Sequence, residues 1–274
     1  MEKRRVLLVN DLPGYGKVAL SGMMPVLSRM GYEVLNLPTA LLSSTLDLGK
    51  YEILDTTDYM RRCLAVWEEL HITYDAVCTG FILSEEQNAL VEELCRRGKA
   101  GGAKILVDPI MGDGGRLYNG MTEQTVARMK KLCAQGDVVL PNLTEATFLA
   151  DCYRGRPEVE AYQLREIAKR ICDLGAKAVV ITSAVVGGKS QVYGYEADGK
   201  NSFSVPYERI PLRLPGTGDL FAAFLAGHYL KGMSLEGSTR KTVDILERLI
   251  LADQEKGTGY KGIPVEQYWE KLGV

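Results

Sequence analysis

The chain alternates between short apolar runs and longer amphipathic stretches from one end to the other. Apolar residues three and four positions apart mark one face of each amphipathic stretch, as in Met60, Leu64 and Trp67. The β-branched runs between these stretches have the length of buried parallel strands: Val6–Asn10, Val34–Leu37, Ala76–Thr79, Ile105–Asp108, Val138–Leu140 and Ala178–Thr182. This alternation predicts an α/β fold, a doubly wound and mostly parallel central sheet flanked by helices.

The pattern changes after Thr182. Gln191–Tyr195 and Ser202–Pro206 flank the polar stretch Glu196–Asn201, which predicts a late β-hairpin. Further helices are predicted from Gly218 to about Lys231, near Lys241–Glu255 and over Val265–Leu272. Because no repeat, low-complexity tract or linker interrupts the chain, we expect a single domain over residues 1–274.

Composition narrows the class of protein. The 274 residues are 46% hydrophobic and 25% charged, with a net charge of −2, which is typical of a globular protein with a large core. No Lys/Arg run supports a nucleic-acid or membrane partner. The first apolar run is too short for a signal peptide, so we expect a cytoplasmic protein with reduced cysteines. The six cysteines include no CxxC pair, which disfavours a zinc site.

Ligands of open α/β sheets bind beyond the carboxyl ends of the strands. Polar residues follow the predicted strands at five points: Asn10-Asp11, Thr79-Gly80-Phe81, Asp108 through Asp113, Asn142 through Glu145, and Thr182-Ser183. We therefore expect the chemistry of the protein among these residues.

The strongest local pattern is Gly216-Thr217-Gly218-Asp219, directly before a predicted helix. Glycines let the backbone approach a ligand, and amides at a helix N-terminus favour an anion such as a transferring phosphoryl group. A carboxylate beside such an anion is repelled by it, and a base that accepts an alcohol proton accounts for Asp219. From these residues alone, Asp219 is equally well explained as an aspartate that favours a helix N-terminus.

Two acidic segments are candidates for magnesium. Asp108 and Asp113 flank a proline and a glycine after a strand, and paired carboxylates there suit Mg²⁺ or its waters. Asn142 and Glu145 could hold a hydrated magnesium and nucleotide phosphates. The alternatives are a turn in the first segment and a capping box in the second, which the spacing of three favours.

Two glycine-rich segments mimic nucleotide motifs. Gly14 to Ala19 fits GxGxxA after the first strand, but Glu33 falls at the start of the second strand, where a ribose carboxylate does not belong. Gly187-Gly188-Lys189-Ser190 resembles the end of a Walker A loop, with Ser183 at the position of the first glycine. We interpret both as turns or substrate loops.

Taken together, the segments resemble the ribokinase-like superfamily and, within it, the pyridoxal and pyridoxamine kinases. The likeness covers nearly the whole chain. It rests on the order and spacing of these segments: Leu37-Pro38-Thr39-Ala40, Thr79-Gly80-Phe81, Asp108-Pro109-Ile110-Met111-Gly112-Asp113, Pro141-Asn142-Leu143-Thr144-Glu145 and Gly216-Thr217-Gly218-Asp219-Leu220-Phe221. The resemblance implies ATP-dependent phosphorylation of the hydroxymethyl group of a small heteroaromatic alcohol, namely a B6 vitamer such as pyridoxal, pyridoxine or pyridoxamine. It also implies Mg²⁺ as cofactor, a monovalent cation as a further candidate, and a homodimer.

The resemblance also implies roles for individual residues. Asp219 is similar to the base that activates the substrate hydroxyl, and Gly216, Thr217 and Gly218 to the anion hole. The metal set implied is Asp108, Asp113 and Glu145. The ATP and phosphate set implied is Asp113, Tyr118, Asn142, Glu145, Thr182 and Ser183. The substrate set implied is Asp11, Thr45, Phe81 and Asp219, with Phe81 stacking on the ring.

The chain departs from the family pattern in the alcohol pocket. Ser43-Ser44-Thr45-Leu46-Asp47 stands where members usually carry Ser-Asn-His-Thr-Gly, so Thr45 replaces their threonine only with a one-residue shift. Ile82-Leu83 lacks the glycine expected after Phe81. The alternatives are a hydroxymethylpyrimidine kinase of thiamin synthesis, a non-catalytic ATP- or vitamin-binding homologue and, less favoured because Phe81 suits a flat ring, a sugar kinase.

Overall fold

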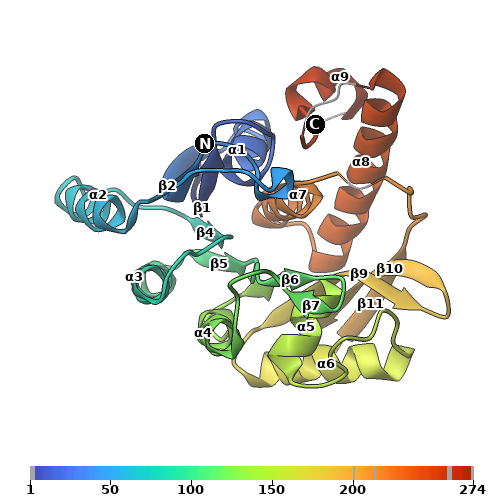
Figure 1. The fold of residues 1–274 in the computed structure, drawn as a ribbon. Helices are drawn as coiled ribbons and strands as arrows, with labels where there is room; N and C mark the ends of the chain where they lie inside the picture. Colours follow the sequence, from blue (N-terminus) through green and yellow to red (C-terminus); the bar gives the residue numbers. More distant parts are fainter. Residues whose placement is uncertain (1–3, 200, 213, 258–260, 273–274) are drawn as a thin grey trace. The chain divides into compact units, whose positions relative to one another are not determined.

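The structure, a computed structural model, describes residues 4–199, 201–212, 214–257 and 261–272. The chain divides into two compact units. Unit 1 comprises Met1–Gln87 and Ile210–Val274, and unit 2 comprises Asn88–Arg209. In the colours of Figure 1, the blue and red ends of the chain therefore belong to one unit, and the green and yellow middle belongs to the other.

Unit 1 contains a sheet whose strands are ordered β4-β1-β2-β3. β4, β1 and β2 are parallel, and β3 is antiparallel to β2. Its elements, as far as the structure describes them, are β1 (Arg5–Pro13), α1 (Ala19–Arg29), β2 (Glu33–Leu42), the 3-10 turn η1 (Leu46–Leu48), β3 (Ile53–Asp55), α2 (Thr57–Glu69), β4 (Ala76–Thr79), α7 (Thr217–Leu230), α8 (Leu235–Lys256), the 3-10 turn η2 (Val265–Gln267) and α9 (Trp269–Leu272).

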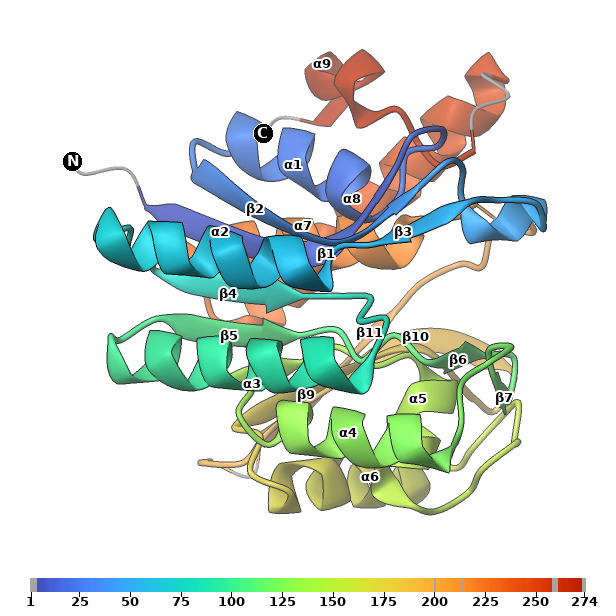
Figure 2. The ribbon, with the colours of Figure 1, turned by 60° about the vertical axis from the view of Figure 1, so that its left-hand side comes forward.

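Helices cover both faces of the unit 1 sheet. The connection through α1 runs from β1 to β2, and the connection through α2 runs back from β2 to β4. Because right-handed crossovers in opposite directions place their helices on opposite faces, α1 and α2 lie on different sides, and Figure 2 shows α2 on the near side. α7 packs against α1, β4 and α8 and is apolar nearly all round, as expected of a buried helix.

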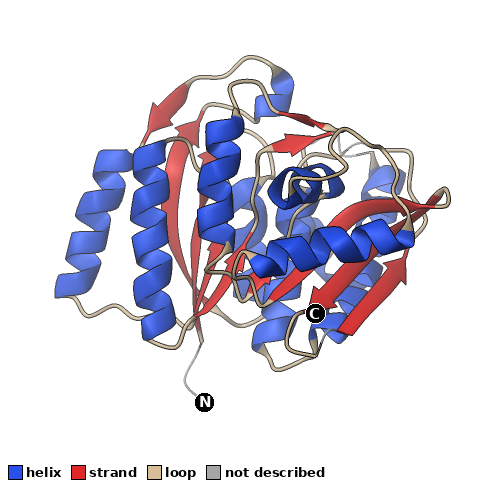
Figure 3. Ribbon diagram, turned by 90° about the horizontal axis from the view of Figure 1, so that it is seen from below, coloured by secondary structure: helices blue, strands red, loops and turns tan. Residues whose placement is uncertain are grey.

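Unit 2 has strands in the order β11-β10-β9-β8-β5. β5, β8 and β9 are parallel, and β10 and β11 add an antiparallel hairpin. Its elements are α3 (Glu85–Ala100), whose first turn contains the boundary between the units, β5 (Lys104–Val107), the short hairpin β6 (Gly112–Asp113) and β7 (Arg116–Leu117), α4 (Glu123–Cys133), β8 (Val138–Val139), α5 (Leu143–Ala150), α6 (Ala161–Asp173), β9 (Ala178–Val186), β10 (Lys189–Glu196) and β11 (Asn201–Pro206). Figure 3 separates strands from flanking helices by colour.

The α/β class, the six parallel-type strands and the late hairpin are confirmed. Lys200, in the predicted hairpin turn, lies outside the described residues. The Gly187-Gly188 segment is a turn with two positive φ angles between β9 and β10, as interpreted. The single domain over residues 1–274 stays a prediction, since the chain divides into two units without a break in composition.

Two helix boundaries differ from the prediction. α8 begins at Leu235 rather than near Lys241, because the Ser234 hydroxyl accepts a hydrogen bond from the Gly237 amide and caps the helix. The helix predicted over Val265–Leu272 is interrupted at Tyr268, whose hydroxyl donates to Asp253 at 2.7 Å. The hydrogen bond of Tyr268 to Asp253 fixes Tyr268 in a non-helical conformation between η2 and α9.

None of the described helices is both long and apolar enough to cross a membrane. The six cysteines are free thiols in the structure, and their reduced state in the cell stays a prediction.

The loop between β1 and α1 is held by the C-terminal segment of the same unit. The Lys17 amide donates to the Lys261 carbonyl at 2.6 Å, Lys17 and Gly262 form a parallel bridge, and the Lys17 ammonium pairs with Glu266. At Gly262, which has φ +92°, a Cβ would lie 2.3 Å from the Lys17 carbonyl oxygen. No other residue type fits there without moving this loop.

We expect Gly262→Ala to lower the free energy of unfolding by about 3 kcal/mol, from a strained backbone together with overpacking against Lys17. Gly232→Ala is the matched control, because Gly232 has the same φ of +92° but nothing within 4 Å of the added methyl. It should cost only the strain, about 1 kcal/mol. Urea unfolding of both variants measures the difference, and equal losses would show that the contact with Lys17 does not matter.

Candidate active site

Asp219 lies in the first turn of α7, and its carboxylate bonds to distant parts of unit 1. One oxygen accepts from the Asn10 side-chain amide at 3.1 Å, and the other accepts from the Ala19 backbone amide at 2.8 Å. The side chain therefore does not serve as the cap of its own helix, whose N-cap is Gly216. Burial raises the pKa of Asp219, while the two hydrogen bonds act in the opposite direction.

The start of α7 has the properties expected of an anion site. Gly216 adopts a left-handed conformation with φ +80°, and a Cβ there would lie 2.8 Å from the Lys17 carbonyl oxygen. A Cβ at Gly218 would meet nothing within 4 Å, so the backbone is open on that side. The first amides of a helix lack partners within the helix, and the dipole of the 14-residue α7 favours an anion near them.

Asn10, which lies within β1 just before the register shift between β1 and β2, joins three parts of this site. Its side-chain oxygen accepts from the backbone amides of Asp11 at 3.0 Å and Phe81 at 2.8 Å. Its nitrogen donates to Asp219 and also lies 3.6 Å from the Met23 sulfur. Sequence reasoning placed Asn10 among the polar residues after a strand but gave it no role.

Phe81 is held at its backbone by two predicted motifs. Its amide donates to Asn10, and its carbonyl accepts from the Thr39 hydroxyl at 2.7 Å. Thr45 is 1% exposed, and its hydroxyl has no hydrogen-bond partner among the described residues. An orphaned hydroxyl of this kind favours a ligand that completes its bonding.

Asp11 is buried beside Asp219. Burial and the negative charge of Asp219 raise its pKa to about 7. A proton is then held more tightly in the folded state than in the unfolded state, where the carboxyl titrates near its ordinary value of 3.8. Rising pH between about 4 and 7 therefore lowers the stability of the fold.

We expect Asp11→Asn to become progressively more stable than the unmodified protein as pH rises from 4 to 7, by up to about 4 kcal/mol at pH 8, because three pKa units of unfavourable ionisation are removed. Urea unfolding at pH 5 and pH 8 measures the effect. Asp198→Asn, an exposed site in the β10–β11 connection, should show no such trend. A gain independent of pH would contradict the raised pKa.

In unit 2, Asn142 and Glu145 form the capping box of α5. The Asn142 side chain accepts from the Glu145 amide, and the Glu145 carboxylate accepts from the Asn142 amide at 2.9 Å. Glu145 also accepts from the backbone amides of Met111 at 3.0 Å and Gly112 at 3.4 Å. The capping alternative is thus observed, together with a second role in holding the segment after β5.

The other predicted residues of unit 2 cluster around this helix start. Asn142 donates to the Gly112 carbonyl at 2.8 Å and forms a bridge with Thr182, whose amide donates to Pro141. Ser183 is exposed and adopts a left-handed φ of 55°, a conformation that is often strained and found at functional positions. Tyr118 is 42% exposed next to β7.

Asp113 and Glu145 interact electrostatically, but the described residues form no metal cluster around them. Burial and the charge of Asp113 raise the pKa of Glu145 to about 7. Among the described side chains, no three of His, Cys, Asp and Glu meet as they do in a protein metal site. Mg²⁺ usually binds one or two carboxylates together with waters and substrate phosphates, so oxygen donors at Asp108 and Asp113 fit it.

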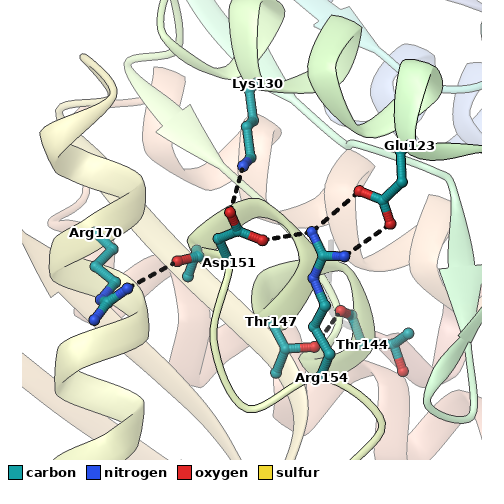
Figure 4. Close-up of polar contacts among 8 residues, drawn as sticks. Glu123, Lys130, Thr144, Thr147, Asp151, Arg154 and Arg170 are labelled. Carbon is teal, nitrogen blue, oxygen red and sulfur yellow. Dashed lines mark hydrogen bonds and ion pairs between the residues drawn. The ribbon is translucent and has the colours of Figure 1, made fainter.

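The far end of α5 is held by an ion-pair network (Figure 4). Asp151 ends the helix with φ +57° and pairs with Arg154 at 2.6 Å and Lys130 at 3.9 Å, while Arg154 also pairs with Glu123 at 2.7 Å. Arg154 further covers the Phe148 ring at 4.6 Å. These ion pairs connect the end of α5 to Glu123 and Lys130 of α4.

We expect Glu145→Gln to lower the free energy of unfolding by about 1–3 kcal/mol, because the amide nitrogen would face a backbone N–H that loses its acceptor. Glu123→Gln, which breaks an exposed pair with Arg154, should cost less than about 1 kcal/mol. Urea unfolding compares the two. Equal small effects would mean that the backbone bonds of Glu145 contribute little.

Comparison with known proteins places this geometry in a family. The phosphomethylpyrimidine kinase family profile matches residues 31–264. A pyridoxine/pyridoxal/pyridoxamine kinase of Bordetella avium is 29% identical over 264 residues, covering 90% of this chain and 86% of that protein. A provisionally named phosphomethylpyrimidine kinase of Bacteroides thetaiotaomicron, crystallised with pyridoxal, is 32% identical with a TM-score of 0.91 and covers 100% of this chain and 96% of its own.

A third relative is the pyridoxal kinase of Lactobacillus plantarum, whose structure is 25% identical with a TM-score of 0.89 over 99% of this chain and 97% of its own. The chain belongs to the phosphomethylpyrimidine kinase family, within the ribokinase-like superfamily. It is an enzyme that transfers phosphate to an alcohol acceptor, which confirms the reaction class predicted from the sequence.

Proposed function

We propose that the protein uses ATP to phosphorylate the hydroxymethyl group of a B6 vitamer, with Asp219 as the general base. The relatives named above act on or bind B6 vitamers, which supports this acceptor. The observation that carries the proposal is the carboxylate of Asp219, half-buried at the open N-terminus of α7 and oriented by donors on both of its oxygens.

In this reaction Asp219 accepts the hydroxymethyl proton as the alcohol oxygen attacks the γ-phosphorus in line with the leaving group. A base with a raised pKa holds the abstracted proton more readily than an ordinary aspartate does. The backbone amides of Gly216, Thr217 and Gly218 stabilise the charge on the transferring phosphoryl group.

Unit 2 supplies groups for the nucleotide. We assign the phosphate contacts to Tyr118, Asn142, Thr182 and Ser183, and the magnesium contacts to Asp108, Asp113 and Glu145. Glu145 already accepts hydrogen bonds from three backbone amides. Two of them belong to Met111 and Gly112, so Glu145 also fixes the position of the segment that carries Asp113. Bound Mg²⁺ would neutralise phosphate charge, and it would also offset the burial and the Asp113 charge that together raise the pKa of Glu145.

Unit 1 supplies the acceptor pocket. Phe81 offers an apolar surface to a flat ring, and Asp11 and the unpartnered Thr45 hydroxyl offer polar contacts to its substituents. The departures around Thr45 and Ile82 fall in this pocket, so they bear on which alcohol is preferred. The family's own name favours a second candidate acceptor, hydroxymethylpyrimidine, which is also a flat heteroaromatic alcohol.

A homodimer is part of the proposal. Unit 1 exposes large apolar side chains on neighbouring elements, with Ile53 and Leu54 on β3, and Tyr59 and Val66 on α2. Exposed apolar surface of this kind is often covered by a protein partner.

We expect Asp219→Asn to lower kcat by at least ~100-fold with little change in ATP affinity, since it removes the base but keeps the shape of the side chain. Asp244→Asn, an exposed change on α8, is the matched control and should leave turnover intact. Phosphorylation is measured with pyridoxal, pyridoxine, pyridoxamine and hydroxymethylpyrimidine. Near-normal turnover of Asp219→Asn would remove this residue from the role, and no turnover with any of these alcohols would favour a non-catalytic homologue.

A further inference from the structure

We propose that Asn10 is a positioning residue of the reaction, which sets the orientation and ionisation of Asp219 and ties both to the backbone of Phe81. The inference rests on the proposed function, because it assumes that Asp219 is the base. It assigns a task to a side chain that touches the base rather than the reacting atoms.

The orientation of the Asn10 amide is determined by its neighbours. Two backbone amides, those of Asp11 and Phe81, donate to one end of the side chain, which must therefore be its oxygen. The nitrogen end then faces Asp219, whose oxygen accepts at 3.1 Å. Asn10 is 1% exposed, so water does not compete for these bonds. Reversing the amide would set donor against donor at one end.

Gly80 makes room for this arrangement. A Cβ at Gly80 would lie 2.4 Å from the side-chain carbon and nitrogen of Asn10. The Gly80 amide donates to the Val9 carbonyl at 2.8 Å, so the backbone is held in place at this approach. The glycine of the Thr79-Gly80-Phe81 motif thus admits the carboxamide that reaches from Phe81 to Asp219.

A second donor completes the support of the base. The Ala19 amide donates to the other oxygen of Asp219, and Ala19 adopts a left-handed φ of 48°, which is unusual for a residue with a Cβ. The preceding residues are fixed by the contacts of Lys17 with Lys261 and Gly262. With one donor on each oxygen, the carboxylate plane cannot rotate without losing a bond.

The two donors also oppose the groups that disfavour ionisation of Asp219. The titratable group on the adjacent strand that interacts with it is Asp11, of the same sign. Lys17, in the loop before α1, directs its ammonium to Glu266. The Asn10 and Ala19 N–H groups are therefore the favourable electrostatic partners that the described contacts give to the ionised base.

The test is Asn10→Asp, which keeps an oxygen for the Asp11 and Phe81 amides and replaces the donor to Asp219 by an acceptor. We expect kcat at pH 7 to fall about 10- to 100-fold, on the scale of a misdirected catalytic group, with the KM for ATP within twofold. The acidic limb of the kcat–pH profile should move up by at least about one pH unit, because a like charge beside a carboxylate raises its pKa. Activity should therefore recover in part at high pH.

The matched control is Asn36→Asp, the same change at a half-buried position of β2 in the same unit, which should leave the acidic limb in place. If Asn10→Asp is not folded by circular dichroism, Asn10→Ala removes the donor without adding charge and should move the limb in the same direction by less.

Two results overturn the inference: full activity of the Asn10 variants, or a loss of kcat at all pH values with an unmoved limb, as a merely structural role would give. The proposed function fails in a different way, through an active Asp219→Asn protein. An inactive Asp219→Asn protein combined with an unmoved limb in the Asn10 variants would leave the function standing and remove only the role of Asn10.

Discussion

The hydrogen bond between Asn10 and Asp219 is the constraint on which the catalytic half of unit 1 depends. It joins residues 209 positions apart, from within β1 to the first turn of α7. Both partners also accept hydrogen bonds from backbone amides, so the bond can form only when β1, the segment after β4 and α7 are packed correctly. A displacement of α7 would leave a half-buried carboxylate, whose pKa is already raised by burial, with fewer donors, which is costly.

Much of the fold could be predicted from local pattern. Ala76–Thr79 matches β4 at both ends because an apolar run that is buried on both sides has a sharp boundary at its polar neighbours. β10 and β11 followed from two alternating runs around a polar turn. β3 was not predicted, because Ile53 and Leu54 are exposed and no buried face marks the strand. α1 was not predicted as a separate helix either, and it contains Pro25, a residue that usually disfavours a helix interior. The 3-10 turn before α9 depends on the long-range bond of Tyr268 to Asp253.

The candidate site was predictable in its residue types and less so in their tasks. The polar residues after each strand, including Asn10, stood out because the topology brings strand ends to ligand sites. The spacing of Asn142 and Glu145 indicated a capping box, and the structure contains one. The spacing could not predict the hydrogen bonds of Glu145 with the Met111 and Gly112 amides, because these bonds depend on how the segment after β5 packs against α5 in the tertiary structure. For the same reason Ala19, in a segment interpreted as a turn, gave no sign of donating to Asp219.

Like charges are held together in both units, and this is where structure and chemistry meet. Asp11 lies beside Asp219 in unit 1, and Asp113 acts on Glu145 in unit 2; in each pair one carboxyl has its pKa raised to about 7. Such pairs oppose folding above neutral pH, and packing alone gives no reason to bury them. In the proposed reaction, Asp219 would take up a proton from the alcohol in unit 1, and a divalent cation would offset the carboxylate charge in unit 2. The proposed transfer of a phosphoryl group from magnesium-ATP to an alcohol would require both, so under that proposal the two buried carboxylate pairs correspond to the two charges that the reaction must manage.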